Sequence, residues 1–348
     1  MAEAAVEETS EGAPGLGKVA AVVGATGFVG SHLVKCLLER GYAVRGSARD
    51  PTGAAWLYEV AGREAGKRLT LQPVHLDVDA AERDTQLDSL LDGADAVFLC
   101  AGFERQEPAT IDFMVNSALA TIQSARRKKV AAVVLTSSGG STNPPGLTNE
   151  TPKREHEHWS DPELQKSKGR WSPAAKTLME INALKAVGRN QQNEIVEAAL
   201  ADDAPRLCIM NPNLILGTQL KPGAITGNSL PWVLGILKGE KMNTEIPNDS
   251  MSIIDVRDLA ALHVACVERS DASGRYFGVN RSFPWEEILG TFKTVYPAYS
   301  IPPRFEGDAN TPTQFDCSRR DSLGIPLRGL EDTVKDLVAF FTERGDLS

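Results

Sequence analysis

The chain has 348 residues, of which 42% are hydrophobic and 24% are charged. This is ordinary globular composition, with enough apolar material for one large core or two smaller ones. The formal net charge of −9 argues against a nucleic acid or an anionic membrane as partner, because both require clustered Lys and Arg. The one compact basic run, residues 126–129, closes a helical pattern, where positive charge complements the helix dipole.

The sequence lacks signals for secretion and for membrane insertion. Residues 1–17 are acidic, without a charged-then-apolar pattern, and we expect them to form a disordered tail. No apolar run approaches the roughly 20 residues of a membrane helix. The five cysteines have no paired spacing, which is typical of reduced thiols. We therefore expect a cytoplasmic protein.

Strand and helix patterns alternate from Lys18 onward. Continuous apolar runs are typical of strands buried on both faces of a parallel sheet, and amphipathic stretches lie between most of them. The alternation predicts a Rossmann-type α/β fold, in which a doubly wound parallel sheet carries helices on both faces. We expect the first helix at residues 28–39 and strands at residues 19–23, 43–48, 69–77, 96–101, 131–138 and 206–212.

Long irregular segments interrupt this pattern at residues 139–171, 217–251 and 283–315. Loops of this length inside a compact domain are usually functional lids, or they assemble into a second lobe. We predict a Rossmann domain over residues 18–216, including the insertion at 139–171. A small discontinuous C-terminal substrate lobe then occupies most of residues 217–348, and about residues 252–282 return to the Rossmann core.

A glycine-rich turn, Gly24-x-x-Gly27-x-x-Gly30, lies between the first strand and the first helix. Gly24 allows a tight turn, Gly27 lets backbone N–H groups approach a pyrophosphate, and Gly30 permits close helix–strand packing. The helix N-terminus adds unpaired N–H groups and the positive end of its dipole. This context predicts a dinucleotide site, whose turn is completed by Thr26, Phe28 and Val29.

The end of the second strand indicates which dinucleotide is bound. An NAD-selective site usually has Asp or Glu there, to accept a hydrogen bond from the ribose 2′-hydroxyl. This chain has Ala48 followed by Arg49, and a guanidinium suits a 2′-phosphate. We predict NADP(H) as the cofactor. The alternative is that Arg49 only pairs with Asp50 on the surface.

Short motifs in a particular order and spacing continue through nearly the whole chain after the tail. They are "GATGFVGSHLVKCLLERGYAVRGSARDP", "LDVD", "VFLCAG", "VVLTSSGG", "WSD", "NPNLILG", "DVRDLAALHV", "GRYF" and "YPAYSIPP". On these motifs the chain resembles the extended short-chain dehydrogenase/reductases, and within them the dihydroflavonol reductase and cinnamoyl-CoA reductase group.

The resemblance implies roles for individual residues. Ser138 matches the serine that donates a hydrogen bond to the substrate carbonyl, and Lys176 matches the lysine that holds the nicotinamide ribose. Its position just beyond a strand end suits Ser138 for polarising a carbonyl, although a serine there can also cap a turn. The other implied positions are Asn116 behind the active site, Asp77 with Val78 beside the adenine, Ala101 with Gly102 under the cofactor, Pro212 against the nicotinamide, and Asn143 against the substrate.

One expected group is absent from the sequence. The family's acid is a tyrosine four residues before the lysine, and this chain has Ser172 there. A serine hydroxyl is far less acidic than a phenol and is shorter by a whole ring. Ser172-Pro173 also has the pattern of a helix start, which predicts Ser172 as the N-cap.

The histidines of "EHEHW" are a second candidate for unusual chemistry. His156 and His158 alternate on a polar loop without a third ligand, so we predict no metal site. Either imidazole could replace the acid, since it titrates near neutrality. Trp159, on the same loop, is expected to pack over the substrate.

Two functions remain open from the sequence. One is an NADP(H)-dependent reductase of a carbonyl or conjugated double bond, with the proton supplied by Lys176, Ser138 or a bound water. The other is a catalytically silent NADP(H)-binding sensor or a structural subunit. We expect a small-molecule substrate, no nucleic acid or membrane partner, and either a homo-oligomer or a place in a larger assembly.

Overall fold

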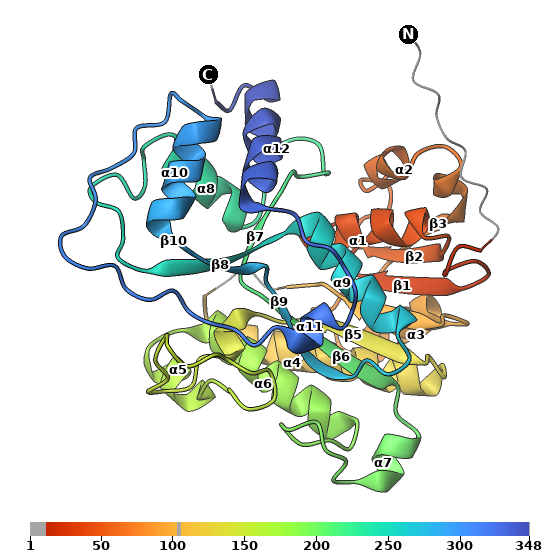
Figure 1. Ribbon diagram of the computed structural model, residues 1–348. Coiled ribbons are helices and arrows are strands. Elements are labelled where there is room, and N and C mark those ends of the chain that lie inside the picture. Colours follow the sequence, from red (N-terminus) through yellow and green to blue (C-terminus); the bar gives the residue numbers. More distant parts are fainter. Residues whose placement is uncertain (1–11, 103–105, 348) are drawn as a thin grey trace.

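The computed structural model describes residues 12–102 and 106–347, and its centre is a seven-stranded parallel sheet (Figure 1). The strand order is β3-β2-β1-β4-β5-β6-β9, so the chain moves outward from β1 in one direction and then resumes on its other side at β4. This order confirms the predicted Rossmann-type fold. The strands are β1 (Val19–Val23), β2 (Ala43–Ala48), β3 (Leu69–Pro73), β4 (Ala96–Leu99), β5 (Ala132–Thr136), β6 (Arg206–Pro212) and β9 (Gly274–Gly278).

Helices cover both faces of this sheet. In β1, Ala20 and Val22 face one hydrophobic cluster while Ala21 and Val23 face the other, as the two-residue period of a strand requires. On the first face lie α1 (Phe28–Glu39), α2 (Trp56–Ala61) and α9 (Val256–Glu268). On the second lie α3 (Ala80–Leu91), α4 (Ala109–Arg127) and α6 (Trp171–Ala186).

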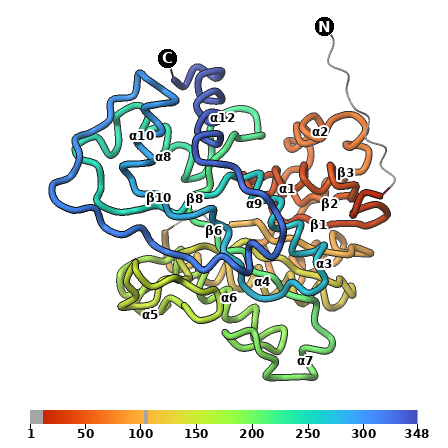
Figure 2. Tube along the Cα trace, viewed as in Figure 1, coloured from red at the N-terminus to blue at the C-terminus, as the bar shows by residue number. Residues whose placement is uncertain are grey.

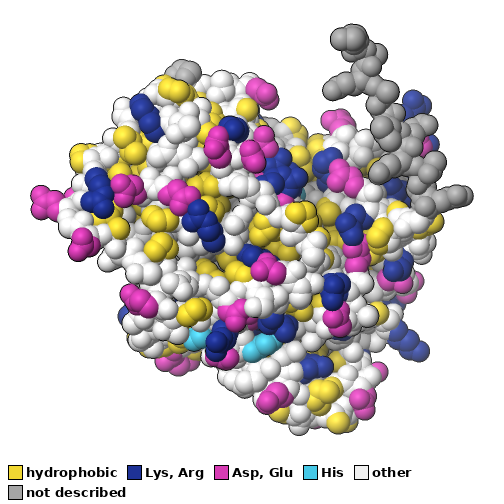
Figure 3. Space-filling view, in the orientation of Figure 1, with side chains coloured by type: hydrophobic (Ala, Val, Ile, Leu, Met, Phe, Trp, Pro, Cys, Tyr) yellow, Lys and Arg dark blue, Asp and Glu magenta, His cyan; other side chains and the backbone are white. Residues whose placement is uncertain are grey.

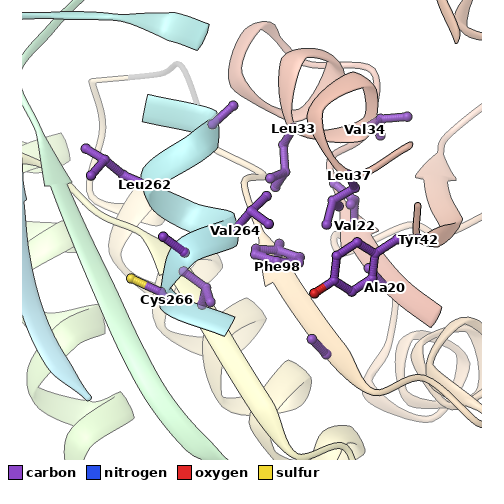
Figure 4. Packing of buried hydrophobic residues seen from close by; sticks show 14 of the residues in the cluster. Ala20, Val22, Leu33, Val34, Leu37, Tyr42, Phe98, Leu262, Val264 and Cys266 are labelled. Atoms are coloured by element: carbon purple, nitrogen blue, oxygen red, sulfur yellow. The ribbon is translucent and has the colours of Figure 1, made fainter. Parts of the chain in front are cut away.

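Figure 4 shows how α9 closes the first face. Val264 of α9 lies beside Leu33 of α1, with Phe98 of β4 beneath them, whereas Leu262 lies on the other side of α9. Because α9 and β9 follow a strand of the second lobe, the chain leaves the Rossmann sheet and then returns to it.

The second lobe is small and has its own core. A three-stranded sheet of order β10-β8-β7 contains β7 (Leu214–Leu216), β8 (Ser250–Asp255) and β10 (Arg281–Pro284). Helices α8 (Ser229–Leu237), α10 (Trp285–Val295) and α12 (Leu330–Glu343) complete it. The tube in Figure 2 shows this lobe at the upper left, above β6 of the large sheet. Residues 214–216 lie in this small sheet rather than in the Rossmann sheet.

Short elements occupy the long connections: η1 (Ala65–Arg68), η2 (Gly139–Ser141), α5 (Pro162–Ser167), α7 (Ala198–Asp202) and α11 (Ser318–Asp321). The third strand is shorter than predicted. It stops at Pro73 instead of residue 77, because its only neighbour, β2, ends at Ala48 and offers no further backbone partners. The fourth and fifth strands also stop two residues early, at Leu99 and Thr136.

Three of the four side chains in the basic run at residues 126–129 make contacts within the fold. Arg127 pairs with Asp88 at 2.8 Å, Lys128 pairs with Asp92 at 3.0 Å, and Arg126 donates to backbone carbonyls. On the face that Figure 3 shows, basic and acidic side chains are interspersed rather than gathered by sign. Neither observation indicates a surface for a polyanion.

Candidate active site

The glycine turn has a backbone geometry that other residues would disrupt. Gly24 has a positive φ of +89°, and a Cβ atom there would lie 2.7 Å from the Ala101 nitrogen at the end of β4. A Cβ atom on Gly30 would lie 2.0 Å from the Gly24 carbonyl oxygen. Helix α1 begins at Phe28 with Gly27 as its N-cap, and no side chain caps it. Its first N–H groups are therefore left for a ligand, and the site fits a dinucleotide pyrophosphate.

Contacts around the turn hold it in place. The Gly24 N–H donates to Ser47 Oγ at 2.8 Å, a contact that the sequence motif did not indicate. Phe28 packs against the core of the second lobe and meets His32 edge-on, with ring centroids 5.9 Å apart. His32 Nε2 in turn lies 2.8 Å from the Thr218 carbonyl oxygen. The amino-terminal end of α1 is thus tied to both lobes.

The predicted adenine side of the site lies at the ends of β2 and β3. Arg49 is exposed directly after β2, and no ion pair joins it to Asp50 within the part of the chain that the structure describes. Instead, Asp50 Oδ1 accepts a hydrogen bond from the Thr52 N–H at 3.0 Å. Asp77 is exposed beyond β3. The remaining predicted cofactor residues are half-buried at Thr26, Val29, Val78 and Ala101, and exposed at Gly102.

The predicted carbonyl-binding side lies at the ends of β5 and β6. Ser138 follows β5 by two residues, and Pro212 ends the adjacent β6. Ser138 Oγ accepts a hydrogen bond from the Gly140 N–H at 3.1 Å, so the alternative capping role is present. Accepting that bond leaves the Ser138 hydroxyl hydrogen available to a substrate oxygen. The two roles are compatible.

Lys176 projects from α6 toward the end of β5. Its Nζ donates to the Thr136 carbonyl oxygen at 2.7 Å. The Thr136 hydroxyl lies 2.8 Å from Nε2 of the buried His263, whose Nδ1 lies 2.7 Å from the Leu259 carbonyl oxygen. Burial lowers the pKa of Lys176 to about 8, and the negative charge of Glu180 opposes that shift. The ammonium group is therefore held on the carbonyl of Thr136, which precedes Ser138 by two residues, and its pKa is about 8.

The structure contradicts the predicted N-cap role of Ser172. Helix α6 begins at Trp171, two residues before the predicted first helical residue Pro173, and its N-cap is Arg170, without a side-chain cap. Ser172 lies in the first turn, where its own backbone N–H donates to Gln106 Oε1 at 3.3 Å. The two extra residues at the start are tolerated because Pro173 remains in the first turn, where its missing N–H costs nothing.

Among the described contacts, no tyrosine lies beside Lys176 in the place of the expected phenol. Tyr42 and Tyr276 are buried in the first-face core of the Rossmann domain, where burial raises the pKa of each to about 12. Tyr299 is buried in the core of the second lobe, Tyr296 is half-buried against that core, and Tyr58 is exposed on α2. The phenols of Tyr42, Tyr276 and Tyr299 are thus buried within the two lobes.

A buried charged network lies behind Ser138 and Lys176. Glu180, one helical turn after Lys176, has an oxygen 2.7 Å from Nε of Arg275 on β9, and both side chains are fully buried. The other Glu180 oxygen accepts from Ser137, Ser141 and, at 2.8 Å, from Asn211 Nδ2. One carboxylate therefore ties the loop after β5 to β6, β9 and α6. The sequence signal was its position four residues after Lys176, on the same helix face.

Trp159, which is predicted to pack over the substrate, also covers the charged network. Its ring stacks on the buried Arg275, with the guanidinium carbon 3.7 Å from the ring centroid. The Arg275 guanidinium also donates to the carbonyls of Ser141 and His158, each at 3.0 Å. A contact between Trp159 and a substrate stays a prediction.

The two loop histidines make separate contacts. His156 packs against Gly274, and burial lowers its pKa to about 4, so it is neutral at pH 7. His158 Nδ1 accepts the Arg154 N–H at 2.8 Å. Both lie against β9, and nothing in the described contacts brings either to Ser138 or Lys176.

Two other predicted residues differ in their surroundings. Asn143 donates through Nδ2 to the Gly139 carbonyl at 2.9 Å and is exposed beside Ser138. Asn116 is exposed on α4, whereas its neighbours Met114 and Ser117 are buried. No contact given by the described residues connects Asn116 to Ser138 or Lys176, and its place behind the active site stays a prediction.

Other features lie apart from this site. A surface cavity of about 490 Å³ is lined by Asn280, Arg281, Ser282, residues 312–315, Cys317 and Arg320, and by none of the predicted site residues. Among residues 12–102 and 106–347, no group of three or more His, Cys, Asp or Glu is arranged to hold a metal ion. Over the same ranges, no helix has both the length and the apolar character to cross a bilayer.

Comparisons with known proteins identify the family of this chain. Residues 24–180 match a family model described as NAD(P)H-binding. The chain is 33% identical over 344 residues to cinnamoyl-CoA reductase 2 of Arabidopsis thaliana, covering 95% of this chain and 94% of the relative. It is 29% identical over 340 residues to tetraketide alpha-pyrone reductase 2 of the same plant, covering 93% and 98%.

Solved structures show the same fold. Vestitone reductase from alfalfa superposes with a TM-score of 0.75 and 22% identity, covering 94% of this chain and 99% of that one. The yeast methylglyoxal/isovaleraldehyde reductase Gre2, solved with NADPH, gives 0.78 and 21%, covering 94% and 100%. This chain thus belongs to the extended short-chain dehydrogenase/reductases, as an NAD(P)H-binding member of the group that contains the cinnamoyl-CoA and tetraketide alpha-pyrone reductases.

Proposed function

We propose that this protein is an NADPH-dependent reductase of a carbonyl group or a conjugated double bond, with a proton donor other than tyrosine. The observation that carries the proposal is the placement of Lys176 Nζ on the Thr136 carbonyl, at 2.7 Å, two residues before Ser138. The Ser138 hydroxyl and the Lys176 ammonium group therefore lie beyond the carboxyl ends of the strands, at the same edge of the sheet as the glycine turn. This is where ligands bind in doubly wound sheets.

NADPH supplies a hydride when it is bound. The free N–H groups at the start of α1 would hold its pyrophosphate, and Arg49 would pair with the 2′-phosphate. The preference for NADPH over NADH rests on Arg49, which is exposed at the end of β2 without a carboxylate partner among the described residues.

The proton is supplied by Lys176. The Ser138 hydroxyl donates to the substrate oxygen and polarises the carbonyl, and the Lys176 ammonium transfers its proton to that oxygen as negative charge develops there. The resulting amine regains a proton from water. A pKa of about 8 leaves Lys176 largely protonated at pH 7 and still able to release the proton. Ser172 stands where the family has its tyrosine, and its hydroxyl is too weak an acid for this step.

A silent NADP(H)-binding protein is the second candidate. It is favoured by one observation: no contact given by the described residues brings a tyrosine to Lys176, and Ser172 neither caps α6 nor offers an acidic group. In that case the cofactor turn is retained for binding alone, and the protein acts as a sensor or as a subunit of a larger assembly.

Two measurements separate these candidates. Fluorescence titration of NADPH and NADH, on the wild type and on Arg49→Ala, tests the cofactor assignment; Arg49→Ala should weaken NADPH binding by roughly tenfold or more and leave NADH binding nearly unchanged. NADPH oxidation is then followed with aldehydes, ketones, enones and acyl-CoA thioesters. Turnover of any of these supports the reductase. Binding without turnover across the whole panel would favour the silent protein, and equal loss of both cofactors in Arg49→Ala would contradict the role of Arg49.

A further inference from the structure

Lys153 is a half-buried cation without a counter-ion. Its Nζ donates to the Asn143 Oδ1 atom and lies 5.4 Å from the centroid of the Phe315 ring. No carboxylate of the described residues lies within ion-pair distance of Lys153. Burial lowers the pKa of this ammonium group to about 8. A charge that is taken out of water normally has an opposite charge beside it, and this one has only an amide and an aromatic ring.

The nearby carboxylates are all engaged elsewhere. Asp316 lies 3.5 Å from Arg154 and also accepts from Ser318. Glu157 pairs with Arg154 at 3.3 Å. Glu155 is buried and accepts the Phe277 N–H at 3.3 Å. Lys153 is therefore not unpaired for lack of acids nearby. Glu150, Glu155 and Glu157 lie within four residues of it, and Asp316 follows Phe315, its partner in an isolated β-bridge.

Backbone contacts fix Lys153 where the two lobes meet. Its N–H donates to the Gln314 carbonyl at 2.9 Å, and its own carbonyl accepts the Asp316 N–H at 2.8 Å. Phe315, between them, packs edge-on against the fully buried Phe277 of β9, with ring centroids 4.8 Å apart. The backbone of Lys153 is thus anchored through both its N–H and its carbonyl, and its side chain takes no part in these bonds.

The side chain points toward the predicted carbonyl-binding residue. Asn143, which holds the Lys153 ammonium through Oδ1, donates through Nδ2 to the Gly139 carbonyl at 2.9 Å. Gly139 follows Ser138 directly. Lys153 is therefore two hydrogen bonds away from the residue next to Ser138. A substrate whose carbonyl rests on Ser138 would extend along this loop and present its far end to Lys153.

We propose that Lys153, positioned by Asn143 and flanked by the Phe315 ring, binds a carboxylate on the substrate at the end remote from the reacting carbonyl. The class of substrate is an oxo acid with an apolar or aromatic body: the carboxylate pairs with the ammonium, and the body lies on Phe315. This inference rests on the proposed reductase function, which it narrows to acidic carbonyl compounds.

Two ligands of equal shape test the inference: 4-formylbenzoate and its neutral isostere 4-formylbenzamide. Dissociation constants are measured calorimetrically on the full chain saturated with NADP⁺, which cannot reduce them, and kcat/KM is measured with NADPH. The variants are Lys153→Met and Lys153→Arg, with Lys168→Met, an exposed lysine in the same insertion, as the matched control.

We expect the wild type to prefer the carboxylate by about tenfold to hundredfold in both measurements. Lys153→Met should abolish the preference while keeping turnover of the amide, and Lys153→Arg and Lys168→Met should retain it. Equal affinity for the two ligands in the wild type, or a preference that survives in Lys153→Met, would overturn the inference even if both aldehydes are reduced. A Lys153-dependent binding preference without any turnover would support it and contradict the reductase function instead.

Discussion

The cofactor half and the proton-transfer half of the site are built in different ways. At the glycine turn, the binding groups are backbone N–H groups, and the shape depends on the absence of Cβ atoms at Gly24 and Gly30. At the ends of β5 and α6, the chemistry depends on single side chains, chiefly Ser138 and Lys176. A backbone site is insensitive to most side-chain changes outside its glycines, whereas a side-chain site can lose its acid through one substitution and keep its scaffold. We propose that this chain combines an intact backbone site with a side-chain site of the second kind.

The largest expected effect comes from breaking the buried network of the proton-transfer half. Glu180→Leu leaves the Arg275 guanidinium buried without its counter-ion, which costs about 3–5 kcal/mol of unfolding free energy. Urea denaturation followed by circular dichroism measures the loss. The double variant Glu180→Leu/Arg275→Met should recover part of it, because both charges are then removed. A loss below about 1 kcal/mol in the single variant would mean that the pair does not hold this half together.

The cofactor half is disrupted by a single methyl group. Gly30→Ala forces a Cβ atom against the Gly24 carbonyl, so the turn has to shift. The dissociation constant for NADPH should rise by roughly tenfold to hundredfold. Gly290→Ala is the matched control, since that helical position in α10 has no heavy atom within 4 Å of the added Cβ. Unchanged NADPH affinity in Gly30→Ala would show that the turn does not bind the cofactor.

The pH dependence of turnover tests the role of Lys176. Because burial lowers its pKa to about 8, the ammonium form is present below that pH and is lost above it. If Lys176 donates the proton, kcat should fall about tenfold per pH unit above 8 while KM for NADPH stays nearly constant. Initial rates between pH 6 and pH 10 provide the profile. A constant kcat with a rising KM for NADPH would instead assign the ammonium group to cofactor binding alone.

The smallest expected effect concerns the start of α6. Ser172→Ala should change the unfolding free energy by no more than about 0.5 kcal/mol, because the Ser172 side chain caps nothing. Asp79→Ala is the comparison, since Asp79 caps α3 by accepting from the N–H groups of Ala81 and Glu82; its loss should cost about 1 kcal/mol. Thermal denaturation of the two variants checks the difference. A similar loss in both would restore the capping role of Ser172.

Sequence reasoning located the elements more accurately than the side-chain contacts. The second and sixth strands and the first helix have the predicted bounds, because apolar runs and glycine stops depend on local sequence. The third strand was too long because its length depends on a partner strand that sequence order does not reveal.

Among the site residues, too, those in a contiguous motif could be predicted, whereas contacts between residues distant in the sequence could not. The glycine turn was predictable because its motif is contiguous. The stacking of Trp159 on Arg275 was not predictable, because nothing local indicates that a residue more than 100 positions later lies beneath its ring. Lys153 was missed for the same reason, since its isolation from carboxylates depends on the pairing of Arg154, Asp316 and Glu157 in space.

The central claim is that the cofactor half is intact and that only the acid of the proton-transfer half has been replaced. Comparison of the wild type with Ser172→Tyr tests it most directly, by NADPH titration and by NADPH oxidation with one reducible aldehyde at pH 7. The account predicts equal NADPH affinity and a kcat that increases by about 100-fold or more in Ser172→Tyr, the usual contribution of a positioned general acid. Equal kcat in the two proteins, or an absence of NADPH binding in both, would contradict it.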